Sequence, residues 1–420
     1  MGARELYSDA AKLEQARGIR ERDVGIGDIC LTERQASIDD RDQLRAFYEH
    51  LSSQSRYFRF FGKPRVGTIV EDVMHALASR DAVTLVAEVD HRIVAVAQYF
   101  PTSSAGRAEA AFAIADAHQG RGIGTKLLER LGVVARSRGI TSFEAYLLHD
   151  NQKMRQVLVD SGFALTWDRL DGQIRHVVFS PAESPQLHEK EKVRARAAAQ
   201  TSLRPFFRPT TVAVIGAGRR RGGIGAEIFD NLVATGFHGP IIPVNSAGGS
   251  VEGVPVVRSV TNIEGEVSLA VIAVPCDQVA GVVDDCIAKG VKALLIISAG
   301  FAETGAGGRE REAAILDKVR AAGIRLIGPN CMGVLNTDPA VRLNATFSLV
   351  YPPLGRVALS TQSGALGLAI LDYAARLNIG FSTFASIGNK ADVSSNDLLQ
   401  YWADDPGTDV ILLWNSTSTR

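Results

Sequence analysis

Hydrophobic positions in the first part of the chain follow both strand and helix periodicities. Val83–Val89 and Arg92–Phe100 are apolar runs around Asp90-His91, which predicts two antiparallel strands joined by a tight turn. Further strands are predicted at Ile29–Gln35, Ala108–Ala115, Ser142–Leu148 and His176–Phe179. Helices are predicted at Asp40–Leu51, Ile69–Ala78, Gly122–Arg138 and, before the C-capping Gly162, Gln152–Ser161. The first part is therefore expected to be a mixed α/β domain.

The pattern changes at Pro181–Arg204, a charged, alanine-rich stretch without core periodicity, which we interpret as a partly helical linker. After it, short aliphatic strands alternate strictly with helices, which predicts a doubly wound parallel sheet. The strands are predicted at Thr211–Ile215, Ile241–Val244, Leu269–Val274, Ala293–Ser298 and Arg325–Ile327. The helices between them are predicted at Ala226–Thr235, Val279–Ala288 and Glu310–Ala322. From Gly355 the alternation begins again, with elements predicted at Arg356–Ser360, Ala365–Leu377, Phe381–Ile387, Asn396–Trp402 and Val410–Trp414.

Composition narrows the class of protein. A chain of 420 residues, 46% hydrophobic and 22% charged, is expected to form two or three globular domains. Lys+Arg and Asp+Glu are both 46, so the balanced charge gives no indication of a nucleic-acid partner. The spacing of Cys30, Cys276, Cys286 and Cys331 predicts reduced thiols and no metal site. No apolar run approaches the roughly 18 residues of a membrane span, and the charged N-terminus is unlike a signal peptide. We expect a cytoplasmic protein without a membrane partner.

The segment Ala108–Leu131 carries the first candidate site. A mostly apolar strand runs into Gln119-Gly120-Arg121-Gly122-Ile123-Gly124-Thr125, and a helix follows directly. The glycines allow a tight turn and leave the amide N–H groups at the helix start open. With the positive end of the helix dipole and Arg121, these donors suit a diphosphate. The spacing differs from the dinucleotide motif G-x-G-x-x-G, and a glycine-rich helix entry without a ligand is the alternative.

The sequence Q-G-R-G-I-G-T after a strand resembles the acyl-CoA diphosphate loop of the GNAT N-acyltransferases, over about residues 29–180. Leu51–Gly62 resembles the GNAT branch that is fused to NDP-forming acyl-CoA ligase-like modules. In that branch the strand before the loop begins with Ala-Glu, here Ala108-Glu109. The resemblance implies that Glu109 is the general base for an attacking amine. The chemistry agrees, because an ammonium group must lose a proton before it attacks a thioester. The alternative is a solvent-facing strand residue.

Three further positions belong to this candidate site. Asn151 resembles the later GNAT asparagine that faces the cofactor arm, and its alternative role is that of a helix N-cap. Tyr57 and Arg59 are candidates for shaping the acceptor site, although aromatic residues in this position are also typical of a core.

A second candidate site begins at Val212–Ala226, where a strand, a glycine turn and a helix follow one another. Arg221 stands where the dinucleotide motif needs its third glycine, and the next strand ends at Asn245 rather than at an acid. Both departures argue against NAD. The glycines of the turn and the run Arg219–Arg221 suit a phosphate-rich ligand such as the 3′-phospho-ADP part of CoA. A solvated loop is the alternative.

Strand ends further along the chain extend this pattern, at Val274-Pro275-Cys276, Ser298-Ala299-Gly300 and Gly328–Gly333. They resemble, over residues 204–335, the CoA-binding domain of succinyl-CoA synthetase alpha chains and ADP-forming acetyl-CoA synthetases. The resemblance implies a CoA or acyl-CoA site formed by Gly216, Gly218, Gly222, Gly225, Asn245, Pro275 and Asn330. Cys331 lacks a readable histidine partner, and we interpret it as a small buried residue.

Ser360-Thr361-Gln362-Ser363-Gly364 resembles the phosphate-binding turn of the flavodoxin-like domain of the same ligases, with Ser363 as a binding residue. Those enzymes also use a phosphate-carrying histidine and an ATP-grasp domain, and neither is recognised in this sequence. We therefore interpret residues 336–420 as a truncated domain. Its last strand, Val410–Trp414, is expected to leave an apolar sheet edge that favours a homo-oligomer.

The expected organisation is a GNAT domain at residues 1–180, a linker at 181–203, a Rossmann-like CoA-binding domain at 204–335 and a truncated flavodoxin-like domain at 336–420. The expected function is acetyl-CoA-dependent N-acetylation, with a protein lysine as acceptor, such as one on a metabolic enzyme, and the ligase-like half as sensor or regulator. A small amine acceptor, an ADP-forming acyl-CoA ligase component that needs a separate ATP-grasp subunit, and a pure CoA-binding module are the alternatives.

Overall fold

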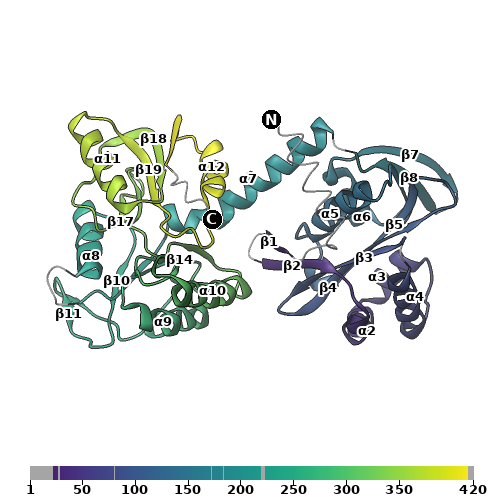
Figure 1. Cartoon of the computed structure of the whole chain (residues 1–420), viewed down its shortest axis with the longest axis horizontal. Coiled ribbons are helices and arrows are strands. Elements are labelled where there is room, and N and C mark those ends of the chain that lie inside the picture. The colour runs from purple at the N-terminus through teal and green to yellow at the C-terminus, as the bar shows by residue number, and fades with distance from the viewer. Residues whose placement is uncertain are drawn as a thin grey trace. The chain divides into compact units, whose positions relative to one another are not determined.

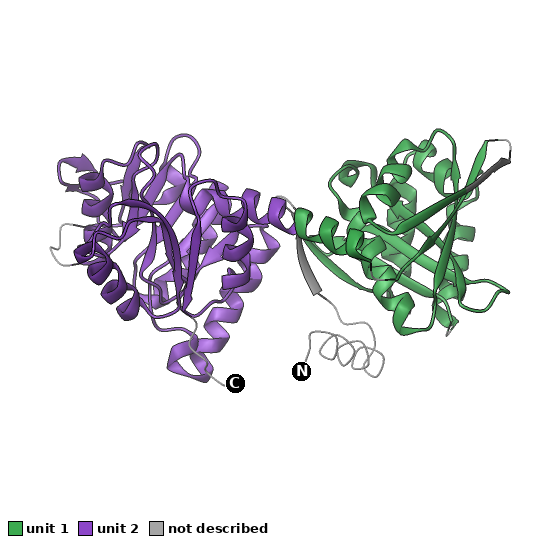
Figure 2. Cartoon of the chain, turned by 90° about the horizontal axis from the view of Figure 1, so that it is seen from above, with its two compact units in different colours: residues 1–194 green, residues 195–420 purple. Residues whose placement is uncertain are grey.

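The computed structural model describes residues 22–26, 29–79, 81–171, 173–182, 184–218 and 223–414. The chain divides into two compact units, unit 1 (Met1–Arg194) and unit 2 (Ala195–Arg420), coloured separately in Figure 2. The stretch expected to be a partly helical linker lies mostly within helix α7 (Pro185–Phe207).

Unit 1 is built on an eight-stranded sheet with the order β1-β2-β3-β4-β5-β6-β8-β7 (Figure 1). The strands are β1 (Arg22–Ile26), β2 (Ile29–Gln35), β3 (Val83–Val89), β4 (Arg92–Pro101), β5 (Arg107–Ile114), β6 (Ser142–Leu148), β7 (Ala164–Asp171) and β8 (Ile174–Ser180). The helices are η1 (Ile38–Asp40), α2 (Arg41–His50), α3 (Ser53–Phe60), α4 (Val66–Ala78), η2 (Asp116–His118), α5 (Ile123–Ser137) and α6 (Gln152–Ser161). Neighbouring strands are antiparallel except β5 and β6, which are parallel.

Alternating side chains of the central strands give unit 1 three layers. Val86 and Val96 belong to a core formed with α2 and α4. Leu85 and Ala97, which alternate with them, belong to a second core formed with α5. Because successive strand residues point to opposite faces, these helices cover the two sides of the sheet.

The first sheet of unit 2 is parallel, with the order β10-β9-β13-β14-β15. Its strands are β9 (Val212–Ile215), β10 (Ile241–Val244), β13 (Leu269–Ile272), β14 (Ala293–Ile296) and β15 (Arg325–Ile327). Helix α8 (Ile224–Thr235) packs on one face, and α9 (Cys276–Lys289) and α10 (Ala306–Ala321) pack on the other. Smaller elements are β11 (Ser250–Val251), β12 (Val254–Pro255), η3 (Val260–Asn262) and η4 (Ala302–Thr304).

The second sheet of unit 2 has the order β17-β16-β19-β18-β20. Its elements are β16 (Gly333–Asn336), β17 (Leu343–Thr346), β18 (Leu354–Thr361), α11 (Gly364–Arg376), β19 (Phe381–Ser386), α12 (Ser395–Ala403) and β20 (Val410–Trp414). Strand β20 lies at the sheet edge, where Leu412 is 45% and Trp414 is 53% exposed. The apolar edge expected from the sequence is therefore present among the described residues.

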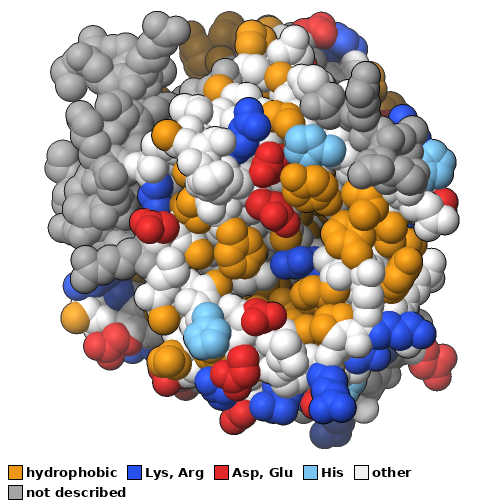
Figure 3. All heavy atoms as spheres, turned by 90° about the vertical axis from the view of Figure 1, so that its right-hand side faces the viewer, with side chains coloured by type: hydrophobic (Ala, Val, Ile, Leu, Met, Phe, Trp, Pro, Cys, Tyr) orange, Lys and Arg blue, Asp and Glu red, His pale blue; other side chains and the backbone are white. Residues whose placement is uncertain are grey.

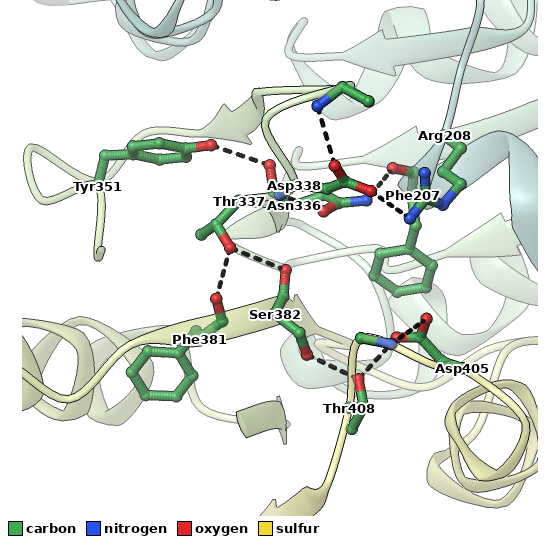
Figure 4. Close-up of polar contacts among 12 residues, drawn as sticks. Phe207, Arg208, Asn336, Thr337, Asp338, Tyr351, Phe381, Ser382, Asp405 and Thr408 are labelled. Carbon is green, nitrogen blue, oxygen red and sulfur yellow. Dashed lines mark hydrogen bonds and ion pairs between the residues drawn. The ribbon is translucent and has the colours of Figure 1, made fainter. Parts of the chain in front are cut away.

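Polar side chains connect the end of α7 to this second sheet (Figure 4). Asn336 Nδ2 donates to the carbonyl oxygen of Phe207 at 2.9 Å, and Tyr351 donates to the carbonyl oxygen of Asn336, also at 2.9 Å. Ser382 and Thr408 share a hydroxyl hydrogen bond of 2.7 Å that links β19 to the segment before β20.

The structure confirms the α/β fold class. Each strand and helix named from the sequence is present, with ends shifted by a few residues. The sequence pattern did not predict α3, β1, β7, β16 or β17. Helix α3 has no fully buried residue, and β16 and β17 are four-residue strands, so none of these three carries a long periodic pattern.

Candidate functional site: a cleft between two separating strands

The candidate site of unit 1 lies where β5 and β6 separate. The two strands pair over residues 107–109 and 142–144, and no further pairs connect them in the described part of the chain. Beyond Glu109 a cleft of about 810 Å³ opens, lined by residues 110–114 of β5 and 145–147 of β6. Figure 3 shows a face of unit 1 on which hydrophobic side chains gather around a hollow. An unpaired strand edge inside a cleft offers backbone N–H and C=O groups to a ligand.

The predicted glycine loop forms one end of this cleft. Gly120 and Gly122 have φ of 76° and 88°, a left-handed conformation in which glycine carries no side-chain penalty. Gly122 is the N-cap of α5, so the amides of Ile123, Gly124 and Thr125 begin the helix without a capping side chain. A Cβ added at Gly124 would lie 2.8 Å from Cδ1 of Ile114, so a larger residue there requires the Ile114 side chain to shift. The loop thus directs helix-start donors into the cleft.

Gln119 lines the cleft, but its side chain is already occupied by protein contacts. Gln119 Nε2 donates to Ser55 Oγ at 3.1 Å and to the carbonyl oxygen of Ile114 at 3.0 Å. Gln119 Oε1 accepts from Lys153 Nζ at 2.8 Å. Lys153 therefore brings a positive charge to the loop, a feature that sequence reasoning missed because Lys153 lies 34 residues further along the chain.

Arg121 is exposed and is not among the residues that line the cleft. Its positive charge nevertheless acts on this end of the site. Burial lowers the pKa of His118, and the positive charge of Arg121 lowers it further. The Nδ1 atom of His118 is buried without a hydrogen-bond partner. The neutral imidazole of His118 is thus favoured at neutral pH.

Glu109 lies on β5 where pairing with β6 ends, and it lines the cleft. Its strand partner in register is Glu144, whose Oε2 lies 3.4 Å from His176 Nε2. On the other side lies Arg59 of α3, which also lines the cleft and donates to Gln98 Oε1 at 3.2 Å. Burial lowers the pKa of the Arg59 guanidinium, and the negative charge of Glu109 opposes that change.

The other candidates of unit 1 are also located. Asn151 is the N-cap of α6, with Oδ1 accepting from the backbone N–H of Met154 at 3.1 Å, and it lines the cleft as well. The N-cap role is therefore present, and it leaves the side-chain amide N–H₂ available to a ligand. Tyr57 is 40% exposed and does not belong to the core.

In unit 2, most predicted CoA-binding residues meet at the carboxyl ends of β9, β10 and β13. A Cβ added at Gly216 would lie 2.3 Å from the carbonyl oxygen of Ala273, and one at Gly225 would lie 2.6 Å from that of Gly216. Asn245 Nδ2 would lie 2.9 Å from a Cβ at Gly218. Pro275 is the N-cap of α9 and follows β13. Gly222 and Arg219–Arg221 lie outside the described residues.

The strand order explains why these turns converge. Across the sheet the strands stand in the order β10-β9-β13-β14-β15. The chain therefore passes from β9 to its neighbour β10 on one side and from β13 to its neighbour β14 on the other side, so the two connections leave in opposite directions. A crevice outside the carboxyl ends of such neighbouring strands is where open α/β sheets bind ligands.

Asn330 and Ser363 follow other strands, β15 and β18. Strand β15, which precedes Asn330, is separated from β9 by β13 and β14. Asn330 Nδ2 instead donates to Asn389 Oδ1 at 3.3 Å. Ser363 caps α11 through Oγ, which accepts from the N–H of Leu366, and the adjacent Gly364 lies against Met332. These two residues belong to a second cluster of loops.

Cys331 is buried, as the sequence suggested, and its Sγ lies 3.3 Å from the carbonyl oxygen of Ile296. Burial raises the pKa of the Cys331 thiol to about 12, and burial likewise raises that of Cys286 to about 12. Because only the thiolate is reactive, we expect both to resist alkylation by iodoacetamide at pH 8 in the native protein and to react after denaturation. Mass spectrometry of the labelled peptides measures this, and rapid native labelling of Cys331 would contradict its assignment as a structural residue.

Comparison with known proteins agrees with this architecture. Family models match the acetyltransferase (GNAT) family at residues 44–163, a CoA binding domain at 210–337 and a succinyl-CoA ligase like flavodoxin domain at 354–416. An ADP-forming acetate–CoA ligase of Methanocaldococcus jannaschii is 45% identical over 206 residues, which are 49% of this chain and 28% of that protein. The alpha subunit of the ADP-forming acetate–CoA ligase I of Pyrococcus furiosus is 44% identical over 217 residues, 51% of this chain and 46% of the subunit.

Among solved structures, the GNAT domain of S. lividans PAT is 35% identical, with a TM-score of 0.35, and the match covers 38% of this chain and 96% of that domain. The chain spans less than half the length of each of these two ligases.

The chain thus combines a GNAT domain with the CoA-binding and flavodoxin-like domains of the ADP-forming acyl-CoA ligases. It carries the features of an enzyme that binds CoA or its thioesters. Among the described residues, none of the helices has the length and apolar character to span a bilayer.

Proposed function

We propose that unit 1 is an acyl-CoA-dependent N-acyltransferase that uses acetyl-CoA. The observation that carries the proposal is the position of Glu109 where β5 and β6 separate, in the same cleft as the glycine loop. The loop amides and Lys153 would hold the diphosphate of acetyl-CoA, and the open edge of β5 would hold the amide-bearing arm of the same molecule. The thioester would then reach the region of Glu109.

The chain's own residues supply what the reaction needs. The Glu109 carboxylate accepts one proton from the acceptor ammonium, and the free amine attacks the thioester carbonyl carbon. The carbon–sulfur bond breaks, and the second proton of the nitrogen neutralises the leaving CoA thiolate. Arg59 lines the same cleft as Glu109, so a positive charge lies in the site together with this carboxylate.

We propose a protein lysine as the acceptor. Glu109 and Glu144 are partners in register on adjacent strands, and their charges attract an ammonium group. Incubation of a cell proteome with labelled acetyl-CoA tests this acceptor class. Label on lysine peptides that depends on Glu109 supports a protein acceptor, whereas label found on small amines alone would contradict it.

The comparisons favour a second function for unit 2 more directly than they favour lysine acetylation. Its relatives at 44–45% identity are ADP-forming acetate–CoA ligases, so unit 2 is also a candidate ligase component that acts with a separate ATP-grasp subunit. In that case, adding such a subunit to the chain with acetate, CoA and ATP produces acetyl-CoA, ADP and inorganic phosphate. If a complete ligase is active under the same conditions and this pair is not, unit 2 is instead a CoA-binding regulator.

A further inference from the structure

A chain of hydrogen bonds connects α3 to the glycine loop. Asp116 Oδ2 accepts from the backbone N–H of Ser52, the N-cap of α3, at 2.9 Å, and Asp116 Oδ1 accepts from Ser52 Oγ at 2.8 Å. Asp116 Oδ1 also accepts from Ser55 Oγ at 2.7 Å. The carboxylate therefore holds the first turn of α3 through three donors.

Ser55 passes this connection on to the loop. Its single hydroxyl proton is donated to Asp116, so its oxygen is the acceptor for Gln119 Nε2 at 3.1 Å. Gln119 directly precedes the Gly120–Gly122 turn, and its remaining amide groups bond to Ile114 and Lys153. The position of the loop's first residue is thus set in part by α3.

The charge of Asp116 suits this role. Partial burial would raise the pKa of its carboxyl group, but the hydrogen bonds from Ser52 and Ser55 outweigh burial and hold the pKa below its ordinary value. Asp116 is therefore an anion at neutral pH, and a charged acceptor strengthens each of its hydrogen bonds.

The two ends of this hydrogen-bond network lie at the proposed sites of two different substrates. The glycine loop is the proposed diphosphate site, whereas α3 carries Arg59, which lies beside Glu109 and the acceptor. We propose that Asp116 and Ser55 are positioning residues that couple occupancy of the glycine loop by CoA to the ordering of α3, so that thioester binding organises the acceptor side. This inference rests on the proposed function, because it takes the loop as the CoA site.

Amide hydrogen exchange of the full chain tests the coupling, with CoA as the probe. In the wild type, saturating CoA is expected to slow exchange in residues 119–126 and, by at least about threefold, in residues 53–60. Ser55→Ala removes the link and is expected to abolish protection of residues 53–60 while the loop stays protected. Ser55→Thr keeps the hydroxyl and is expected to restore it, and Asp116→Asn is expected to behave like Ser55→Ala. Ser53→Ala, on the same helix and exposed, is the matched control and is expected to behave like the wild type.

Each result has a separate meaning. Equal protection of α3 in Ser55→Ala and wild type would overturn the coupling, because direct ligand contact would then explain the effect. Protection of the loop without any change in α3 of the wild type would also overturn it and would leave the proposed function intact. Absence of loop protection in the wild type would overturn the proposed CoA site together with the coupling.

Discussion

Replacement of Glu109 by glutamine is expected to lower the rate of acetyl transfer by about 10²- to 10⁴-fold, the usual contribution of a general base. Glutamine keeps the size of the side chain and its place at the end of the β5–β6 pairing, but it cannot accept a proton from the ammonium group. The affinity for acetyl-CoA is expected to stay within about threefold of the wild type, because the glycine loop is unchanged. Steady-state rates with labelled acetyl-CoA, together with titration calorimetry, measure both quantities.

Glu49→Gln is the matched control for this prediction. Glu49 is exposed on α2 and is not among the residues that line the cleft, so its neutralisation makes the same change of charge outside the site. Its rate is expected to equal that of the wild type. Retention of full activity in Glu109→Gln would show that another group takes the proton and would reject the assignment of Glu109.

Gly122→Val is expected to remove acetyl-CoA binding at unit 1. With φ of 88°, position 122 costs a side-chain-bearing residue about 1–2 kcal/mol, and more for a β-branched one, so the turn must change its conformation. The helix-start amides then no longer point together into the cleft. Titration calorimetry of the full chain with acetyl-CoA should show the loss of one binding event.

Gly139→Val separates this local effect from general strain. Gly139 also has a positive φ, of 80°, and a Cβ there meets no heavy atom within 4 Å, so valine introduces similar strain outside the cleft. Its binding isotherm is expected to match the wild type. If Gly122→Val binds acetyl-CoA as Gly139→Val does, the loop geometry does not matter for the ligand.

The sequence predicted the parts of the site that are contiguous in the chain. The loop from Gln119 to Thr125, the strand before it and the helix after it are found as expected, because glycine turns and apolar periodicity are local signals. The turn at Asp90-His91 is a further example, since both residues take a positive φ between β3 and β4.

Contacts between distant segments could not be predicted in this way. Gln119 was expected to bind the ligand, yet its side chain is bonded to Ser55 and Lys153, which lie 64 and 34 residues away from it in the chain. The separation of β5 from β6 depends on where pairing stops, and neither strand carries a residue that marks this point. Helix α3, which brings Arg59 to the cleft, is only eight residues long, too short for its apolar positions to form a pattern over several turns.

In unit 2, the predicted binding residues follow strands that are not all neighbours in the sheet. Gly216, Gly218 and Asn245 approach one another because β9 and β10 are neighbours in the sheet. Asn330 follows β15, which lies three positions from β9 across the sheet, and strand order is a property of the fold rather than of a local motif. The carboxyl-end rule for parallel sheets predicts the edge at which these turns lie but not their places along that edge.

A crystal structure of the full chain with acetyl-CoA tests the central claim most directly. We predict that diphosphate oxygens lie about 3 Å from main-chain nitrogens of residues 120–125 and that the thioester carbonyl lies beside Glu109. Acetyl-CoA bound only in unit 2, with the glycine loop of unit 1 making no contact to phosphate at saturating ligand, would contradict the account.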